Sequence, residues 1–286
     1  MTVEAGPKSA SERLTSFVAN AGLEIYPDSK ILQKVDVLSR STKISVTSSP
    51  TKGIEETLNF TKFLKEKGFE VVPHIAARSI KDIKQLEVIS IFLNHYGIEE
   101  IFAIAGDNER PAGNYDSSVT MLDRLLGMTR TVTRVGVAGY PEGHPFVFDA
   151  QLTESLKAKA DIAKKYGVGI HVDTQMCFDA NAITDWIKYL HSNDVNIPII
   201  LGVPVTNSFA KLLQFSIRCG VGDSKRFLQA AGMGNAFQLV NYKPDDLLKS
   251  LSKTQDFESI AGLRIFTLNN VKGSLEWQKN FNCNES

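Results

Sequence analysis

The sequence predicts an α/β protein folded as a (β/α)₈ TIM barrel, and three observations support this fold class. Short runs rich in Val, Ile and Phe alternate with longer amphipathic stretches over about 250 residues, the usual size of such barrels. Most of the short runs end in small or polar residues, as parallel strands buried on both faces do. The alternative, a doubly wound open sheet, needs a glycine-rich phosphate turn after its first strand, and "LEIYPDSKI" contains no glycine. No linker divides the chain, so we expect a single domain over residues 1–286.

The predicted elements follow in order along this domain. Ser9 and Glu12 have the spacing of a capping box, which predicts a helix within an N-terminal extension over residues 1–20. The apolar runs predict strands at 22–26, 43–49, 69–77, 99–107, 134–141, 168–175, 197–205 and 263–269. Amphipathic patterns predict helices at 53–68, 79–97, 117–128, 152–167, 180–194, 207–220, 223–232 and 243–253. Several of these patterns end on glycine, which accepts the positive φ that follows a helix.

Composition argues against several classes of protein. Lys and Arg number 32 and Asp and Glu number 32, so the formal net charge is zero, unlike that of a protein that coats nucleic acid or an anionic membrane. Cys177, Cys219 and Cys283 form no C-x-x-C pair, so neither a zinc site nor a disulfide framework is indicated. The N-terminus lacks the apolar segment of a signal peptide, and no uncharged apolar run of ~20 residues could span a bilayer. We expect a cytoplasmic protein.

Polar residues collect at the C-terminal ends of the predicted strands, where barrels carry their active sites. In "IFAIAGDNER" a buried strand runs directly into Gly106, which allows the backbone to turn, and then Asp107 at the rim. Glu24 lies between Leu23 and Ile25, where burial should raise its pKa and make it a candidate general acid. An ion pair with a lysine at the far end of the barrel explains Glu24 equally well.

Other strand ends carry residues for which a structural role is at least as plausible. Thr47 fits a turn former and His74 a hydrogen-bonded structural residue as well as ligand contacts. "GYPEGHP" places Tyr140 and His144 on a loop made rigid by two prolines, and such loops often carry function. Gln175 both donates and accepts hydrogen bonds, so it could recognise an amide-like edge of a heterocycle.

Three of these residues form the strongest set. Glu24, Asp107 and Gln175 come from three strands and point to one mouth, which is how barrel enzymes are built. Phe209 opens a predicted helix and is either a stacking platform or a packing residue. No Ser/His/Asp arrangement, H-E-x-x-H or P-loop is present, so hydrolysis by those routes and nucleotide triphosphate chemistry are unsupported.

The strand-end motifs, in this order, resemble those of the methylenetetrahydrofolate reductase family in its bacterial form, which consists of the catalytic domain alone. "LEIYP" resembles "FEFFP", "FAIAGD" resembles "LALRGD", and "DTQMCFD" resembles "ITQFFFD". The most specific match is "VAGYPEGHP" to "VAAYPEVHP". Further matches are "ISVTSSP" to "VSVTYG", "VVPHIAAR" to "APHLTC", "NYDSS" to "MYASD", "GVPVTNSF" to "GILPVSNF" and "FTLNN" to "YTLNR". The resemblance covers residues 20–270.

The resemblance implies reduction of 5,10-methylenetetrahydrofolate to 5-methyltetrahydrofolate by hydride from NADH or NADPH through bound FAD. It implies that Glu24 is the catalytic acid and that Asp107 favours the cation formed when the folate ring opens. The implied cofactor contacts are Thr47, His74, Gly106, Asp107, Tyr115, Tyr140, His144, Lys157 and Lys159, and the implied substrate contacts are Asp107, Gln175 and Phe209. No metal is implied. The partners are small molecules, with no nucleic acid or membrane, and a homo-oligomer is expected.

The sequence departs from the family at several positions. Ala105 replaces the arginine of "LRGD", with Arg110 five residues further on, and Asn270 replaces the arginine of "TLNR". The helix predicted at 152–167 keeps lysines but lacks the family's acidic start. Folate chemistry is therefore better supported than the manner of FAD binding. Two alternatives stay open: a flavin-free folate-dependent methyltransferase on a related barrel, and a folate-binding protein without catalysis.

Overall fold

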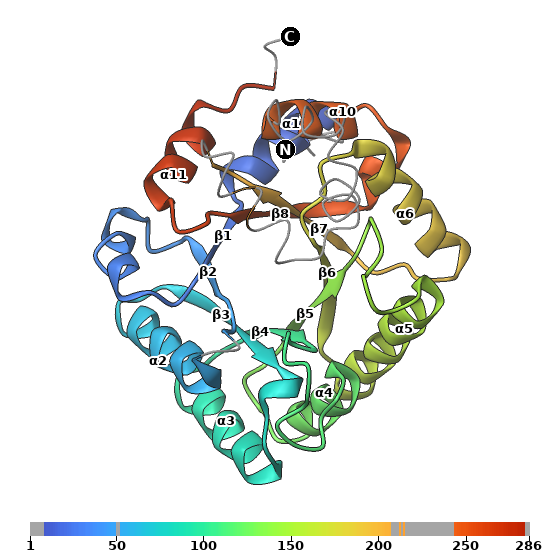
Figure 1. The fold of residues 1–286 in the computed structure, drawn as a ribbon. Coiled ribbons are helices and arrows are strands. Elements are labelled where there is room, and N and C mark those ends of the chain that lie inside the picture. The colour runs from blue at the N-terminus through green and yellow to red at the C-terminus, as the bar shows by residue number, and fades with distance from the viewer. Residues whose placement is uncertain (1–8, 50–51, 207–211, 213, 215–242, 284–286) are drawn as a thin grey trace, which may run out of the picture.

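The computed structural model describes residues 9–49, 52–206, 212, 214 and 243–283. Eight parallel strands form a closed barrel in which each strand pairs with its neighbours in the sequence, and β8 closes onto β1 (Figure 1). The strands are β1 (Gly22–Ile25), β2 (Lys43–Val46), β3 (Glu70–Ala76), β4 (Glu100–Ile104), β5 (Arg134–Gly139), β6 (Gly169–Thr174), β7 (Ile199–Pro204) and β8 (Ile260–Phe266). The predicted fold is confirmed, and each predicted strand corresponds to an observed one.

Helices surround the barrel in the view of Figure 1. They are α1 (Ala10–Ala19), α2 (Gly53–Glu66), α3 (Ile83–His95), α4 (Ser118–Leu126), α5 (Asp149–Tyr166), α6 (Ala180–Ser192), α10 (Pro244–Ser252) and α11 (Val271–Asn280). Short 3-10 helices are η1 (Ser29–Ile31), η2 (Val35–Val37), η3 (Ala77–Ser79) and η4 (Gln255–Ser259). In the part of the chain that the structure describes, no helix is both long and apolar enough to cross a bilayer.

Helix boundaries follow the capping residues. The predicted box at α1 is present, since Ser9 Oγ accepts from Glu12 N at 3.2 Å and Glu12 Oε2 accepts from Ser9 N at 2.8 Å. Helix α3 begins later than predicted, because Asp82 Oδ1 accepts from Gln85 N at 2.9 Å and so caps the helix there. Asn270, one of the departures from the family, caps α11 by accepting from Gly273 N at 3.3 Å.

Two differences from the predicted helices concern the C-terminal third of the chain. Helix α11 was not predicted, although Val271, Ser274 and Leu275 have helical spacing and Leu275 packs against the core. The predicted helices at 207–220 and 223–232 lie outside the described residues, apart from positions 212 and 214.

The apolar core lies between the strands and the helices, whereas the inside of the barrel is crowded and polar. Glycines make room there for larger side chains of neighbouring strands. A Cβ on Gly136 would lie 2.5 Å from the ring of Phe102, and one on Gly202 would lie 2.4 Å from the ring of Phe266. Because real Cβ atoms do not approach so closely, these glycines allow the barrel to close around large interior groups.

Candidate active site

A cavity of about 220 Å³ opens at the C-terminal ends of the strands. Most of the residues predicted to form the site line it together: Glu24, Thr47, His74, Gly106, Asp107, Tyr140, His144 and Gln175. These residues come from six segments that are far apart in the sequence. The barrel therefore brings them to one mouth, which is the usual position of the active site in this fold.

Glu24 and His74 form the buried end of the cavity. Glu24 Oε2 lies 3.6 Å from His74 Nε2, and the two side chains are 16% and 8% exposed. Burial raises the pKa of Glu24 to about 7, while Arg264 lowers it and Asp173 raises it further. Burial also lowers the pKa of His74 to about 3, so His74 is neutral near pH 7. Near pH 7 the close contact is therefore between a carboxyl group that is about half protonated and a neutral ring, and it is not a salt bridge.

Thr47 presents a buried hydroxyl without a hydrogen-bond partner among the described residues. The side chain lies immediately after β2, at the cavity, and the hydrogen bonds of Thr47 are made by its backbone: its N–H donates to Ile25 O at 3.0 Å, and its carbonyl accepts from Thr57 Oγ1 at 3.1 Å. Buried polar groups in native proteins nearly always find a partner, so an unpaired hydroxyl at a cavity indicates a bound group that completes it.

Gly106 and Asp107 form the rim after β4. Gly106 has φ +92°, and a Cβ there would lie 3.0 Å from Ala76 Cβ, so the turn needs glycine. Asp107 follows at the exposed end of the cavity. Asp107 also raises the pKa of His144, although burial has the larger effect and lowers that pKa overall. The rim thus carries a carboxylate and an imidazole that are close enough for the charge of Asp107 to act on His144.

Arg78 holds the loop that carries Asp107, and no sequence motif had marked it. Its guanidinium donates to three backbone carbonyls of that loop, those of Asn108, Glu109 and Asp116. Ala105, which replaces the family's arginine, lines the cavity, whereas Arg110 is exposed and lies outside the lining. Among the described residues no lysine or arginine lines this cavity.

The loop after β5 places two rings at the cavity wall. Tyr140 and His144 meet edge to face with centroids 5.0 Å apart. Gly143, at φ +76°, closes a turn by donating from its N–H to Tyr140 O at 3.0 Å. His144 and Val147 then form an isolated antiparallel bridge. The loop therefore has hydrogen bonds of its own, and its rigidity stays a prediction from its prolines.

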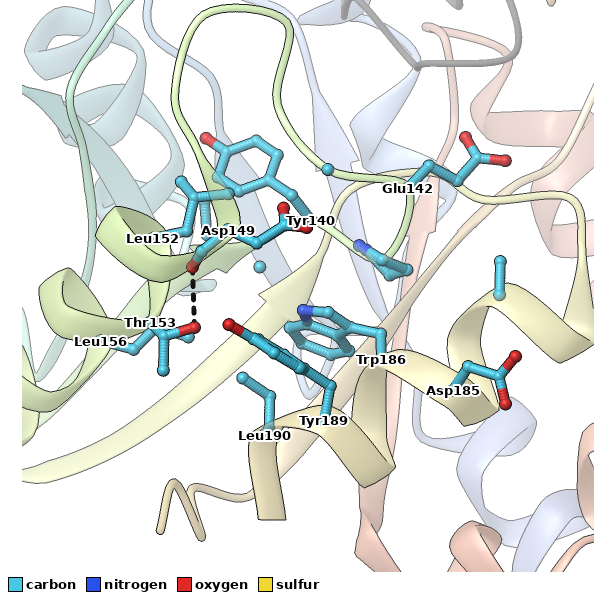
Figure 2. Close-up of a pocket in the computed structure, with 15 residues that line it drawn as sticks. Tyr140, Glu142, Asp149, Leu152, Thr153, Leu156, Asp185, Trp186, Tyr189 and Leu190 are labelled. Carbon is cyan, nitrogen blue, oxygen red and sulfur yellow. Dashed lines mark hydrogen bonds between the residues drawn. The ribbon is translucent and has the colours of Figure 1, made fainter. Parts of the chain in front are cut away.

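A second cavity, of about 390 Å³, lies beside the first, between α5 and α6. Figure 2 shows Trp186 and Tyr189 of α6 facing Leu156 of α5 across it. Ala138 and Tyr140 line both cavities. The end of β5 therefore separates the cavity at the barrel mouth from a second cavity on its flank.

Several predicted cofactor and substrate residues are not brought to the main cavity. Tyr115 is 9% exposed and belongs to the apolar core. On α5, Lys157 pairs with Glu154 at 3.0 Å, and Lys159 is 7% exposed, with burial lowering its pKa to about 8. Phe209 lies outside the described residues. Lys157, Lys159 and Tyr115 therefore do not line the main cavity.

A network of buried charges lies inside the barrel below the cavity, and it was not predicted. Glu100 Oε2 accepts from Lys43 Nζ at 2.6 Å and from Arg134 Nε at 2.9 Å, and Glu100 Oε1 lies 3.2 Å from His171 Nε2. Burial alone would raise the pKa of Glu100, but the hydrogen bonds from His171 and Lys43 hold it well below its usual range. The available signal was alternation: Lys43 is two residues from Ser45 on one strand, so both point inward.

The upper part of the network reaches the cavity. Arg264 Nε donates to Asp173 Oδ2 at 2.9 Å, and His171 Nδ1 lies 2.6 Å from Asp173 Oδ1. Asp173 is 5% exposed and lines the cavity that contains Glu24. Burial would raise the pKa of Asp173, but Arg264 and His171 lower it overall. Two carboxyl groups with oppositely shifted pKa values therefore share one cavity.

Comparison with known proteins identifies the family. The methylenetetrahydrofolate reductase family model matches residues 27–276. The chain belongs to the methylenetetrahydrofolate reductase family. It is 26% identical over 208 residues to 5,10-methylenetetrahydrofolate reductase of Buchnera aphidicola subsp. Schizaphis graminum, covering 72% of this chain and 68% of that one.

More distant matches cover less of the proteins concerned. Methylenetetrahydrofolate reductase 2 of Saccharomyces cerevisiae is 28% identical over 130 residues, which are 42% of this chain and 21% of the yeast protein. The Schizosaccharomyces pombe protein of the same name is 25% identical over 191 residues, 62% of this chain and 28% of its own length. Among solved structures, dihydropteroate synthase from Thermus thermophilus matches with a TM-score of 0.45 and 12% identity over 92% of this chain and 94% of that one. That similarity is too distant to bear on function.

Proposed function

We propose that the protein reduces 5,10-methylenetetrahydrofolate to 5-methyltetrahydrofolate, with hydride from NADH or NADPH passing through bound FAD. One observation carries the proposal: Glu24, a desolvated acid, and Asp107, a carboxylate on the rim, line the same cavity. Membership of the methylenetetrahydrofolate reductase family supports the reaction, and the cavity supports the roles of these two groups.

The described residues fit the ring system of a flavin. The unpaired Thr47 hydroxyl can bond to a polar edge of the ring system, and the rings of His74 and Phe102, tilted at 42° with centroids 4.6 Å apart, add aromatic surface. Tyr140 and His144 close another side. Bound FAD would supply two-electron hydride chemistry. A cavity of about 220 Å³ accepts a ring system rather than a whole dinucleotide, so the rest of the cofactor would extend past the rim.

The remaining cofactor and substrate assignments rest on the family resemblance. Contacts of Lys157 and Lys159 with the FAD phosphates, and of Tyr115 with its adenosine end, stay predictions, since none of these side chains lines the cavity. Gln175 lines the cavity and is proposed to bind the pterin, and Phe209 stays a predicted stacking residue.

Glu24 is the proposed proton donor. Opening the five-membered ring of the substrate puts a proton on the departing nitrogen, breaks its bond to the one-carbon unit and leaves a cation. An acid with a pKa of about 7 holds its proton near neutral pH and can still release it, which is the balance that general acid catalysis needs. His74, neutral and 3.6 Å away, orients the carboxyl group. The Asp107 carboxylate then stabilises the cation until hydride reaches the carbon.

A flavin-free methyltransferase is the second candidate, and one observation favours it. The diphosphate of FAD is usually held by cationic groups or helix N-termini, and no lysine or arginine of the described chain lines the cavity. The visible spectrum of the purified protein separates the two functions. Flavin absorbance that is bleached by NADH or NADPH supports the reductase. A colourless protein that gains no flavin on incubation with FAD supports the methyltransferase.

The role of Glu24 is tested by Glu24→Gln, assayed in two half-reactions. Oxidation of NAD(P)H by an artificial acceptor should be retained, because it needs no proton on folate. Reduction of methylenetetrahydrofolate should fall by about 10² to 10⁴-fold. Glu66→Gln is the matched control, since Glu66 is exposed at the C-terminal end of α2. Equal loss of both half-reactions in Glu24→Gln would contradict the acid role.

A further inference from the structure

We propose that two charges act on the proton of Glu24 in opposite directions: Asp173 is a positioning residue that favours the proton, Arg264 opposes it, and Arg264 and His171 hold Asp173 ionised. The proposal deepens the function above, because it rests on Glu24 being the proton donor. It gives buried charges that also contribute to stability a role in the chemistry of the site.

The guanidinium of Arg264 lies directly below Glu24. It donates through one terminal nitrogen to Ser45 Oγ, and Ser45 is the residue paired with Glu24 between β1 and β2. The same nitrogen would lie 3.4 Å from a Cβ on Gly22, two residues before Glu24 on β1. The ion pair of Arg264 with Asp173 at 2.9 Å therefore joins β8 to β6, the two neighbours of β7, and brings Asp173 into the cavity that contains Glu24.

Both oxygens of Asp173 are engaged by cationic donors. Arg264 Nε takes Oδ2, and His171 Nδ1 lies 2.6 Å from Oδ1. Burial would lower the pKa of His171, but its contacts with Asp173 and Glu100 raise it to about 9, so the ring is charged near pH 7. A carboxylate with two charged partners stays ionised, whereas the ionisable side chain that contacts Glu24 among the described residues is the neutral ring of His74. Pairs of acids held apart in this way are typical of catalytic sites.

The charges around Glu24 oppose each other, and this makes the proposal testable. Burial is the largest cause of its raised pKa, the positive charge of Arg264 acts against burial, and the negative charge of Asp173 acts with it. Among the described residues, the titratable and charged groups around Glu24 are His74, Asp173 and Arg264, with Asp107 and His144 lining the same cavity. His171, Glu100, Lys43 and Arg134 are linked to them through the contacts of His171 with Asp173 and of Arg264 with Glu100. Among these groups, Asp173 and Arg264 are buried and charged and lie above Glu100 and the cations that contact it.

The experiment is a direct titration of Glu24 in the ligand-free protein by ¹³C-carboxyl NMR, with the signal assigned by its loss in Glu24→Gln. Asp173→Asn should lower the pKa of Glu24 by about one to two units, because a buried negative charge is lost and Arg264 is left unopposed. Arg264→Gln should raise it by about the same amount. The double variant, which leaves no unpaired charge, should lie within about half a unit of the wild type.

Circular dichroism checks that each variant is folded, and conservative variants serve as further controls. Asp173→Glu and Arg264→Lys keep the charges and should keep the pKa of Glu24 close to that of the wild type. Asp123→Asn removes a carboxylate at the surface of α4 and should leave the pKa of Glu24 unchanged. If a single variant does not fold, the double variant decides, and a shift above about one unit there overturns the proposal. Shifts of the two single variants in the same direction also overturn it.

The titration needs neither substrate nor flavin, so its outcome is independent of the proposed reaction. If Glu24 titrates as expected but the pH dependence of folate reduction does not follow its pKa, the proposed function fails while the electrostatic coupling stands. If the pKa of Glu24 is insensitive to Asp173 while Glu24→Gln still abolishes folate reduction, the proposed function stands and this inference fails.

Discussion

Glu24 and Glu100 point into the same barrel from β1 and β4, yet they lie in opposite environments. Glu100 is 3% exposed and contacts three cationic groups, Lys43, Arg134 and His171, within 3.2 Å. Glu24 is 16% exposed, and its nearest ionisable contact is His74 at 3.6 Å, which is neutral. The pKa of Glu100 is held well below its usual range, and that of Glu24 is raised to about 7. Partners therefore decide the charge of a buried acid as much as burial does.

The same contrast holds between the two ends of the barrel interior. At the N-terminal ends of the strands, Glu70 adds contacts of 3.0 Å to Lys43 and 3.2 Å to Arg134, so each charge there has a partner. At the C-terminal ends, the Thr47 hydroxyl lacks a partner within the described chain and Glu24 lacks a cation in contact. Groups left incomplete in the folded protein are the ones available to a ligand, so stability and function occupy different levels of one barrel.

Glu100→Gln should have the largest effect on stability. It leaves His171, which is largely buried, without its carboxylate, together with Lys43 and Arg134, whose side chains are 28% and 47% exposed. Because two of these partners reach solvent, we expect a cost of about 3 kcal/mol, the lower end of the range for breaking a buried ion pair. Because the pKa of Glu100 is lowered in the folded state, its contribution is present above the unfolded value of 4.5 and is lost as pH falls. Urea unfolding at pH 7 measures the loss, with Glu66→Gln as an exposed control that should stay within about 0.5 kcal/mol. An unchanged midpoint would show that the network contributes little to stability.

Glu24→Gln should stabilise the protein, and only above the acidic range. The folded protein holds this proton more tightly than the unfolded chain does, so the stability contributed by protonation is complete below pH 4.5 and is lost as pH rises through about 7. Above that pH the ionised Glu24 costs about 3 kcal/mol, which glutamine avoids. Unfolding curves of the wild type and the variant should therefore coincide near pH 4 and separate by pH 8. A gap that is constant with pH would contradict the raised pKa.

The fold could be predicted because strands buried on both faces leave continuous apolar runs. Glu24 could be predicted for a related reason, since a carboxyl group between Leu23 and Ile25 has to be buried. The pairing of the charges at the N-terminal ends of the strands could not be predicted. Glu100 and Arg134 stand at the first positions of their strands, where a charge is typical of an exposed end. Their pairing also joins residues 34 positions apart, which no local pattern reveals.

For the predicted cofactor residues on α5, the sequence showed the charge of the side chains but their burial was not considered. A lysine on a helix after the fifth strand is a reasonable phosphate ligand by charge alone. Lys159, however, is spaced three and four residues from Leu156 and Ala163, both buried, so the helical period turns it toward the protein. Sequence could have shown this, because the face that a helix buries is legible from its period. The sequence shows the charge of a residue more reliably than its access to a site.

The hydroxyls of Ser45 and Thr47, at two successive inward-facing positions, allow the same comparison between the two levels of the barrel, with smaller expected effects on stability. Ser45 accepts a hydrogen bond from Arg264 at the paired level, and Thr47, two residues on, has an unpaired hydroxyl at the cavity level. Ser45→Ala should destabilise the protein by about 1 to 2 kcal/mol, because it leaves a buried charged donor without its acceptor. Thr47→Val should change stability by less than about 0.5 kcal/mol, since it removes no internal bond.

Ligand binding should reverse this order, because Thr47 is the residue left for a ligand to complete. Thr47→Val should weaken flavin binding by about 5 to 10-fold, the loss of one neutral hydrogen bond, whereas Ser45→Ala should change it by less than about twofold. Urea unfolding and flavin titration of the two variants measure both quantities. Loss of stability in Thr47→Val, together with unchanged flavin affinity, would mean that its hydroxyl has an internal role and that the division between the two levels is drawn in the wrong place.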